Sequence, residues 1–214
     1  MYSPQIFRED SLEVLHSLMR AHPLATLVSA GSGGIKASLL PFSVIPDGRK
    51  GVLRVHLAKA NDQVADLGEG KEVLVIFQGP EAYITPSWYL SKAEHGKVVP
   101  TWNYVVIHAR GVPRVTDDHG WLRDQIEDLT KAQEASRAAP WEVGDAPDSF
   151  ISALLDGIVG VEIPIAAIEG KWKVSQNRSE ADRNGVYEGL LREGASEEMA
   201  KLVAGQGASC PRSR

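Results

Sequence analysis

Apolar and polar residues alternate along much of the first half of the chain, as they do in half-buried β-strands. The clearest stretch is Val52-Leu53-Arg54-Val55-His56-Leu57. The same period of two, bounded by Gly and Pro turns, predicts further strands over residues 24–28, 35–45, 73–77, 81–85 and 104–115. Ahead of these strands, a leucine stripe followed by Pro23 predicts a helix over residues 11–21.

The second half of the chain changes to a helical period. Residues 117–136 are expected to form a helix with Leu122, Ile126 and Leu129 on one face. Shorter helices are expected to end at residue 155 and to cover residues 179–192 and 196–203, with strands over 158–163 and 165–174. Because few helices separate the early strands, an antiparallel barrel decorated by helices fits better than a parallel sheet. We therefore predict an α+β fold, mainly β, as one domain over residues 1–204 with a disordered tail over 205–214.

Charge and composition narrow the classes of function. The 214 residues carry 23 Lys and Arg against 28 Asp and Glu, a net charge of −5. Coating of nucleic acid by bulk charge is excluded, because such binding depends on neutralising phosphates with Lys and Arg. The segment Asp117–Asp128 has five acidic residues and one Arg, which makes direct DNA binding doubtful there as well.

Cysteine usage and targeting patterns add further bounds. Cys210 is the single cysteine, so an internal disulfide and a Cys-rich metal site are both excluded. No run reaches the roughly 18 apolar residues that span a bilayer, and the first residues lack a signal-peptide pattern. A cytoplasmic protein without membrane contact is the expectation.

No catalytic constellation is visible in the sequence. The six histidines show no His-x-x-x-His spacing, so no metal site is predicted. No nucleophile–base set stands out either, and the catalytic residues stay unassigned. The stretch Gly31-Ser32-Gly33-Gly34 lacks the remainder of a phosphate-loop motif and is interpreted as a hairpin turn.

Three segments could bind a ligand. In residues 56–67 a strand runs into a short helix with Asn61 as its expected N-cap, and Lys59 stands beside it. Free backbone N–H groups and a lysine at a helix start can hold a phosphate, although a capped loop with a solvated lysine has the same pattern.

The second and third segments are aromatic and cationic. Five of the ten Trp and Tyr residues fall within 83–89 and 102–104, which suits either a planar heterocycle or a packed core or dimer interface. Residues 169–179 bring together Lys171, Lys173 and Arg178 beside Gln176 and Asn177. That composition fits a phosphate and a polar ring edge, with an exposed cationic strand end as the alternative.

Together these segments resemble the PaiB family of FMN-binding negative transcriptional regulators. The resemblance extends over residues 1–204 and departs mildly at Trp172 and Val174, where Phe and Leu are expected. It is carried by Met1-Tyr2 with Phe7, Pro41-Phe42, His56-Leu57-Ala58-Lys59-Ala60-Asn61, Gly79-Pro80 with Tyr83-Ile84, Pro86-Ser87-Trp88-Tyr89, Val99-Pro100-Thr101-Trp102-Asn103-Tyr104, His108-Ala109 and Gly170-Lys171-Trp172-Lys173-Val174-Ser175-Gln176-Asn177.

The resemblance implies an FMN-binding split-barrel fold and a homodimer with flavin at the subunit interface. It places the FMN phosphate at Leu57, Ala58, Lys59 and Asn61, with Lys59 as the charge partner. It places the flavin ring along Ser38, Leu39 and Leu40. It also implies that the pocket is closed by Thr101, Trp102 and Asn103, and approached from the other edge or the other subunit by Lys173, Gln176, Asn177 and Arg178.

Several functions are compatible with this resemblance. The first is an FMN-binding regulator of the PaiB type. The second is a flavin-dependent NAD(P)H oxidoreductase, in which the flavin carries the redox chemistry. A repressor that binds DNA directly ranks lowest because of the acidic segment above. Haem in place of flavin is a further alternative, with His56 or His108 as candidate ligands.

Overall fold

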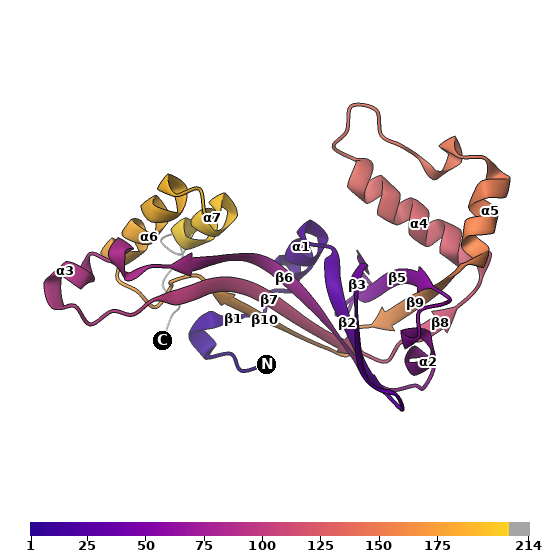
Figure 1. Cartoon of the computed structure of the whole chain (residues 1–214), viewed down its shortest axis with the longest axis horizontal. Coiled ribbons are helices and arrows are strands. Elements are labelled where there is room, and N and C mark those ends of the chain that lie inside the picture. Colours follow the sequence, from indigo (N-terminus) through magenta and orange to yellow (C-terminus); the bar gives the residue numbers. More distant parts are fainter. Residues whose placement is uncertain (206–214) are drawn as a thin grey trace. The chain divides into compact units, whose positions relative to one another are not determined.

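The computed structural model of the chain describes residues 1–205, and the predicted tail with Cys210 lies outside the described residues (Figure 1). Strands and helices follow one another from the first residues to Gly205, which the sequence placed in the tail and which ends the last helix. The strands are β1 Arg8–Glu9, β2 Leu24–Gly31, β3 Gly34–Pro41, β4 Ser43–Ile45, β5 Val52–Ala58, β6 Val73–Ile84, β7 Thr101–Gly111, β8 Arg114–Thr116, β9 Ile158–Pro164 and β10 Ala167–Lys173. The helices are α1 Leu12–Ala21, α2 Gln63–Leu67, α3 Ser91–His95, α4 His119–Glu134, α5 Asp148–Asp156, α6 Glu180–Arg192 and α7 Glu197–Gly205.

Several of the predicted strands have different boundaries in the structure. Residues 35–45 break at Phe42 into β3 and β4, which belong to different sheets. Residues 73–77 and 81–85 form one strand, β6, because the buried positions shift from odd to even numbers around Gln78-Gly79. Because the alternation of buried positions is interrupted there, the sequence pattern predicts two strands where the structure has one. Residues 104–115 instead break into β7 and β8 at Val112-Pro113, where proline lacks the N–H that a sheet ladder needs.

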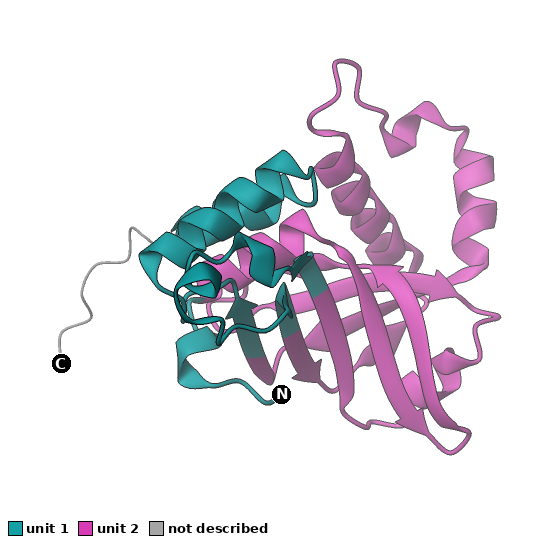
Figure 2. Ribbon diagram, turned by 60° about the vertical axis from the view of Figure 1, so that its left-hand side comes forward, with its two compact units in different colours: residues 1–11, 78–107, 169–214 teal, residues 12–77, 108–168 magenta. Residues whose placement is uncertain are grey.

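The described residues fall into two compact units, neither of which is a continuous stretch of chain (Figure 2). The first unit contains residues 1–11, 78–107 and the chain from residue 169 onward; the second contains residues 12–77 and 108–168. The expected single domain over residues 1–204 stays a prediction.

The second unit is built on a hairpin and a separate small sheet. Strands β2 and β3 pair antiparallel from Leu24 with Pro41 to Gly31 with Gly34, which confirms the predicted turn. Gly34 has a φ of 99°, a conformation that glycine adopts without steric cost. Strand β2 also pairs antiparallel with β6, and the other sheet has the order β4-β5-β9-β8. In the core, the rings of Phe42 and Phe77 meet edge-on, with centroids 5.8 Å apart.

In the first unit, strands β1, β10, β7 and β6 lie side by side in that order. Helices α6 and α7 cover one face of these strands (Figure 1), and their buried side chains are mainly apolar: Val186, Leu190, Met199 and Val203. Gly189 brings α6 close to Trp88, since a Cβ at that position would lie 2.4 Å from the indole ring. The other face presents Tyr83, Trp102, Tyr104, Lys171 and Lys173, which are half-buried or exposed; we call it the aromatic face.

Candidate functional site

The candidate site residues divide between the two units. Those from Ser38 to Asn61 belong to the second unit, and those from Thr101 to Arg178 belong to the first. Each group has its own elements and its own hydrogen bonds.

In the second unit, the end of β5 and strand β3 meet at Asn61. The Asn61 side-chain amide donates to the Ser38 hydroxyl over 3.2 Å, and its Oδ1 accepts from the backbone N–H of Gln63 at 2.9 Å. The predicted helix N-cap is one residue off, because α2 starts at Gln63 and Asp62 takes the N-cap position. Asn61 nevertheless binds a free N–H group at the helix start, so Ser38 and Asn61 form one polar group.

Lys59 stands next to this group and is exposed. Its backbone N–H donates to the carbonyl oxygen of Gly157 at 2.9 Å, which fixes the main chain at this position. Within residues 1–205 its ammonium group has no hydrogen-bond or ion-pair partner. The apolar residue Leu39 is 61% exposed on neighbouring β3, and Leu57 is buried. A free cation, an amide and an open apolar strand are therefore present together in this unit.

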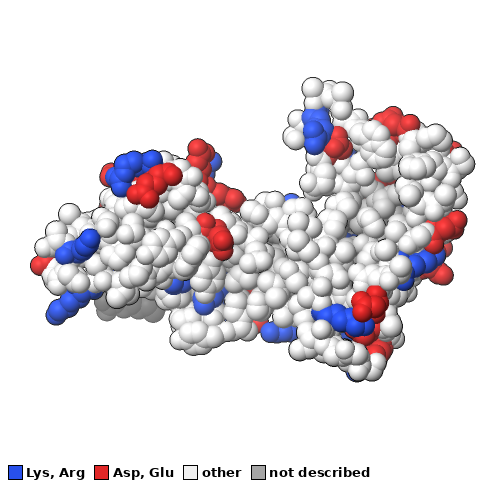
Figure 3. Space-filling view, in the orientation of Figure 1, with Lys and Arg blue, Asp and Glu red and all other residues white. Residues whose placement is uncertain are grey.

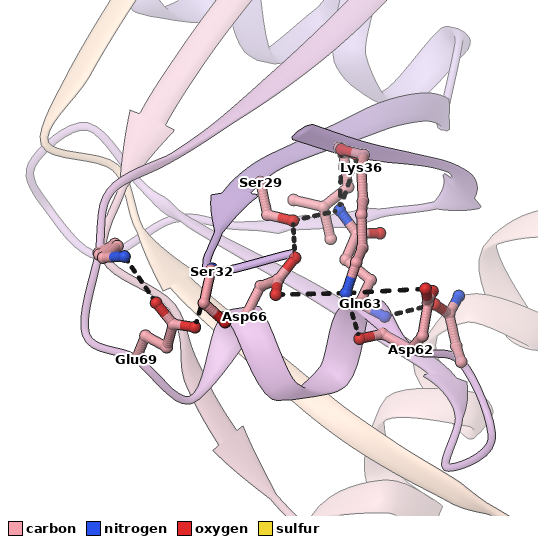
Figure 4. Close-up of polar contacts among 10 residues, drawn as sticks. Ser29, Ser32, Lys36, Asp62, Gln63, Asp66 and Glu69 are labelled. Carbon is pink, nitrogen blue, oxygen red and sulfur yellow. Dashed lines mark hydrogen bonds and ion pairs between the residues drawn. The ribbon is translucent and has the colours of Figure 1, made fainter. Parts of the chain in front are cut away.

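A polar network joins α2 to strands β2 and β3 (Figure 4). Asp66, only 4% exposed, accepts a hydrogen bond of 3.0 Å from the Ser29 hydroxyl and pairs with the Lys36 ammonium at 3.3 Å. Lys36 also donates to the backbone oxygen of Asp62 at 2.8 Å, and the Gln63 amide donates to Ser29 at 3.0 Å. The network fastens α2 to the β2–β3 hairpin, and with it the chain that carries Asn61.

No local pattern in the sequence points to these network residues. Lys36 and Asp66 are 30 positions apart, and α2 has five residues, too few for a helical period to show which side is buried. In the sequence, Gly31 indicates only a turn, and the structure shows a second reason for glycine at this position. A Cβ there would lie 2.0 Å from the Asp66 carboxylate, so a side chain at that position would displace the network.

In the first unit, Lys173 is the centre of the candidate group. Its ammonium donates to the Thr101 hydroxyl and to the backbone carbonyl of Trp102 at 2.7 Å. It also lies 5.8 Å from the centroid of the Tyr104 ring. Burial lowers the pKa of Lys173 below its ordinary value, and the positive charge of Lys171 acts in the same direction. The structure thus brings Lys173 together with Thr101 and Trp102, and the predicted role of these three residues in binding a cofactor stays a prediction.

The side-chain amides of Asn103 and Gln176 form hydrogen bonds with nearby groups of the same chain. Asn103 is buried and donates to the Ser175 hydroxyl at 2.9 Å; Ser175 has a φ of 64°, an unusual value for a residue with a side chain. The Gln176 side chain accepts from the backbone N–H of Val174 at 2.8 Å and donates to the carbonyl of Trp172. These bonds shape the turn after β10. The predicted role of Asn103 and Gln176 in binding a cofactor stays a prediction.

A second buried carboxylate, that of Asp182, lies in the first turn of α6, after the turn that follows β10. Arg178 lies over the Tyr89 ring, 4.6 Å from its centroid, and Asn177 is exposed. Asp182, 4% exposed, accepts from the Ser91 backbone N–H at 3.0 Å and from the Ser91 hydroxyl at 2.8 Å. Burial alone raises the pKa of Asp182, but these hydrogen bonds outweigh it and the net pKa is lowered.

The candidate haem ligands lie on strands of the second unit. Nδ1 of His56 is hydrogen-bonded to the side-chain amide of Gln125 on α4, 2.6 Å from its Oε1. His108 lies on β7 and is half-buried. No three His, Cys, Asp or Glu side chains among the described residues gather as a metal site. No helix in the same part of the chain is long and apolar enough to cross a membrane.

Comparison with known proteins identifies relatives over most of the chain. Residues 1–167 match the family model described as "Putative FMN-binding domain". An uncharacterised protein of Emericella nidulans is 36% identical, covering 95% of this chain and 95% of the relative. The protease synthase and sporulation protein PAI 2 of Bacillus subtilis is 30% identical, covering 95% of this chain and 96% of the relative. The Bacillus relative is a PaiB protein, so the resemblance found in the sequence is confirmed.

Solved structures show the same fold at low sequence identity. The FAD and haem binding protein of Mycobacterium smegmatis aligns with a TM-score of 0.58 and 19% identity over 78% of this chain and 73% of that one. The flavocytochrome Anf3 of Azotobacter vinelandii aligns with a TM-score of 0.56 and 12% identity, over 78% of this chain and 69% of that one. The predicted α+β split-barrel fold with antiparallel sheets is thereby confirmed, and the family match confirms FMN as the cofactor.

Proposed function

This chain belongs to the FMN-binding domain family, and from that premise we propose that it is a flavin-dependent regulator of the PaiB type, working as a cytoplasmic homodimer with FMN at the subunit interface. The observation that carries this proposal is Lys59. Its side chain is exposed and has no hydrogen-bond or ion-pair partner among the described residues, and it precedes Asn61, which bonds Ser38, by two residues. A dianionic phosphate fits a free lysine with amide and hydroxyl groups next to it.

The other candidate residues supply the remaining needs of the cofactor. Ser38, Leu39 and Leu40 would run along the flavin ring, with Leu39 offering exposed apolar surface. Lys173, Thr101 and the other candidate residues of the first unit would contact a polar edge of the ring. They would come from the same copy or from the partner copy. When bound, FMN supplies reversible two-electron redox chemistry. The chain's own residues bind the phosphate, orient the ring and shield it from water.

The homodimer is supported by apolar surface on the β2–β3 hairpin. Strand β3 is the last strand of its sheet, and its residues Ile35 and Leu39 are 80% and 61% exposed, while Leu24 on β2 is 54% exposed. Exposed apolar residues in a row on an edge strand are typical of a surface that another chain covers. Sedimentation analysis of the purified protein tests this point, and a monomer at micromolar concentration would contradict it.

Regulation by direct DNA binding is not part of the proposal. The exposed side chains of α4 include Asp124, Glu127 and Asp128, which repel phosphate. On the face of the described residues drawn in Figure 3, acidic and basic side chains are interspersed. Control through the flavin redox state or through a partner protein fits this charge distribution better. A specific, salt-sensitive gel shift with the upstream DNA of the protein's own gene would contradict this.

The test is to replace Lys59 with Gln and compare two flavins. We expect FMN affinity, measured by quenching of flavin fluorescence, to fall by about tenfold or more, since a hydrogen bond to a charged group contributes about 1.5–3 kcal/mol. Riboflavin, which lacks the phosphate, should bind both proteins equally. Lys71→Gln is the matched control, because Lys71 is in the same unit and already pairs with Glu69 at 2.7 Å. An equal loss for both flavins would contradict a phosphate contact.

The enzymatic alternative is tested with the same holo-protein. Anaerobic addition of NADH or NADPH should bleach the flavin if the chain is an oxidoreductase, and an unchanged spectrum argues against that function. For haem, the observation in favour is the hydrogen bond between Nδ1 of His56 and the Gln125 amide, which leaves Nε2 as the nitrogen that could bind iron. A Soret band in the purified protein, lost in His56→Ala, would establish that alternative.

A further inference from the structure

A hollow of about 630 Å³ opens in the first unit at the edge of the aromatic face. Its walls include Tyr83, Trp88 and Trp102, and its charged residues are Glu81, Arg192 and Glu193. A smaller hollow of about 310 Å³ shares Glu81 and Trp102 with it. Glu81 and Trp102 therefore stand at the centre of the available space on this part of the sheet.

Two aromatic rings form a corner in this hollow. Tyr83 and Trp102 meet edge to face, with their centroids 5.9 Å apart and their planes at 69°. Tyr83 is 48% exposed and Trp102 is 52% exposed. Two half-exposed rings at a steep angle offer a ligand more than one π-surface at the same time, which is how aromatic cages bind ammonium groups.

Two carboxylates, those of Glu81 and Glu193, line the hollow with the two rings. Glu81 precedes Tyr83 by two residues on β6, so both point to the same face, and among the described residues its carboxylate has no hydrogen-bond or ion-pair partner. Glu193 is oriented by the Trp88 indole N–H, which donates to it at 3.1 Å. Arg192 lies 3.8 Å from Glu193, and its side chain is 66% exposed. The charged residues of the hollow sum to one negative charge.

The neighbouring rings already have cations from the chain. Lys171 and Lys173 lie 5.2 Å and 5.8 Å from the Tyr104 centroid. No Lys or Arg of the described residues takes the corresponding position over Tyr83 or Trp102. The Tyr104 ring thus carries cations of the chain itself, whereas no cation of the described residues lies over the rings of Tyr83 and Trp102, beside which Glu81, Glu193 and Arg192 line the hollow.

We propose that this hollow binds an organic cation, an ammonium group with small apolar substituents. The faces of Tyr83 and Trp102 would contact the apolar surface around the charge, and Glu81 and Glu193 would supply the opposite charge. The same two carboxylates repel the phosphate of FMN, so this site is separate from the phosphate contact at Lys59. The proposal goes beyond the flavin function and does not depend on it.

The test compares two probes of the same shape that differ in charge. Choline and its neutral isostere 3,3-dimethylbutan-1-ol are titrated by calorimetry into the full-length protein saturated with FMN. We expect saturable binding of choline and binding of the alcohol at least about fivefold weaker, as a cation–π contact of about 1 kcal/mol requires. Equal affinities would overturn the proposal. So would loss of choline binding on FMN saturation, because the hollow would then belong to the flavin.

Variants of the charged residues locate the site. Glu81→Gln should weaken choline binding by at least about twofold and leave FMN binding unchanged. The control is Glu188→Gln, at an exposed position on α6 outside the hollow, which should change neither. Arg192→Ala should strengthen choline binding, because it removes the like charge beside Glu193. Wild-type choline affinity in Glu81→Gln overturns the proposal.

Removal of the indole tests the aromatic contact. Trp102→Leu should abolish the preference for choline over the neutral alcohol. Trp141→Leu is the matched control, since Trp141 is also about half exposed, at 45%, and lies in the other unit. If Trp102→Leu does not fold, circular dichroism will show it, and the Glu81→Gln result decides alone. A retained preference in folded Trp102→Leu overturns the proposal.

Discussion

Each unit holds its candidate residues in place with one buried aspartate, and the two aspartates do so by different means. In the second unit, Asp66 pairs with the Lys36 ammonium and accepts from Ser29. In the first unit, Asp182 accepts two hydrogen bonds from Ser91, and no Lys or Arg of the described residues forms an ion pair with it. Both side chains are 4% exposed.

The difference bears on which cations remain available to a ligand. In the second unit, Lys36 is engaged by Asp66 and by the Asp62 carbonyl, whereas Lys59, two residues before Asn61, is exposed and can meet a phosphate. In the first unit, neutral donors satisfy the carboxylate, and Arg178 packs on the Tyr89 ring. Among the candidate residues, the second unit therefore presents a free charge at Lys59, whereas Lys173 and Arg178 of the first unit lie against aromatic rings and carbonyl groups.

The largest expected effect is that of Asp66→Ala. The substitution leaves Lys36 without its counter-charge and Ser29 without its acceptor, and removal of one partner of a buried pair is strongly destabilising. Because the Lys36 side chain is 23% exposed, we expect a loss of about 2–3 kcal/mol in the free energy of unfolding, below the full buried value of about 3–5 kcal/mol. Urea denaturation measures it.

Glu69→Ala is the matched control for this substitution. Glu69 follows α2 closely and pairs with Lys71 at 2.7 Å, but that pair lies at the surface, with the Lys71 side chain 57% exposed. Exposed pairs contribute about 0–1 kcal/mol. If both alanine variants unfold at the same urea concentration, the buried network does not fasten α2 to the hairpin.

Asp182→Asn is expected to have a smaller effect at neutral pH, about 1 kcal/mol, because asparagine keeps one acceptor oxygen and loses the charge. The folded pKa of Asp182 is lowered, so its contribution is fully present above the unfolded value near 3.9. It is lost as the pH falls through the lowered folded pKa. Wild type should therefore lose more stability than Asp182→Asn between about pH 5 and pH 2.

Chemical denaturation at a series of acidic pH values measures this difference. Ser91→Ala, which removes one donor and keeps the carboxylate, should give a curve between those of wild type and Asp182→Asn. Parallel curves for all three proteins would show that Asp182 does not differ from an ordinary surface carboxylate, and the comparison between the two units would fail on that side.

The strands and the charged ends of the candidate site follow from local patterns. Alternation locates β5, glycines locate the hairpin turn, and the residues around Asn61 indicate a polar group at the start of α2. The buried pairs depend on contacts between distant positions, such as Lys36 with Asp66, which no local period encodes. The same holds for Gln176: composition shows an amide beside cations, but only the three-dimensional turn shows that this amide binds its own backbone.

Substitution of Lys173 is expected to have the smallest effect on stability, but it is the most specific test. Lys173 is a partly buried cation that, unlike Lys36, has no carboxylate partner among the described residues. Burial lowers its folded pKa, so between that pKa and the unfolded value near 10.4 the unfolded chain binds more protons. Stability should therefore rise with pH through this window, and Lys173→Met should flatten the rise as the pH approaches the unfolded value. Thr101→Val keeps the lysine and should keep the rise. If urea denaturation shows the wild-type slope in Lys173→Met, the cation is as well solvated as an exposed one, and the first unit has a free charge after all.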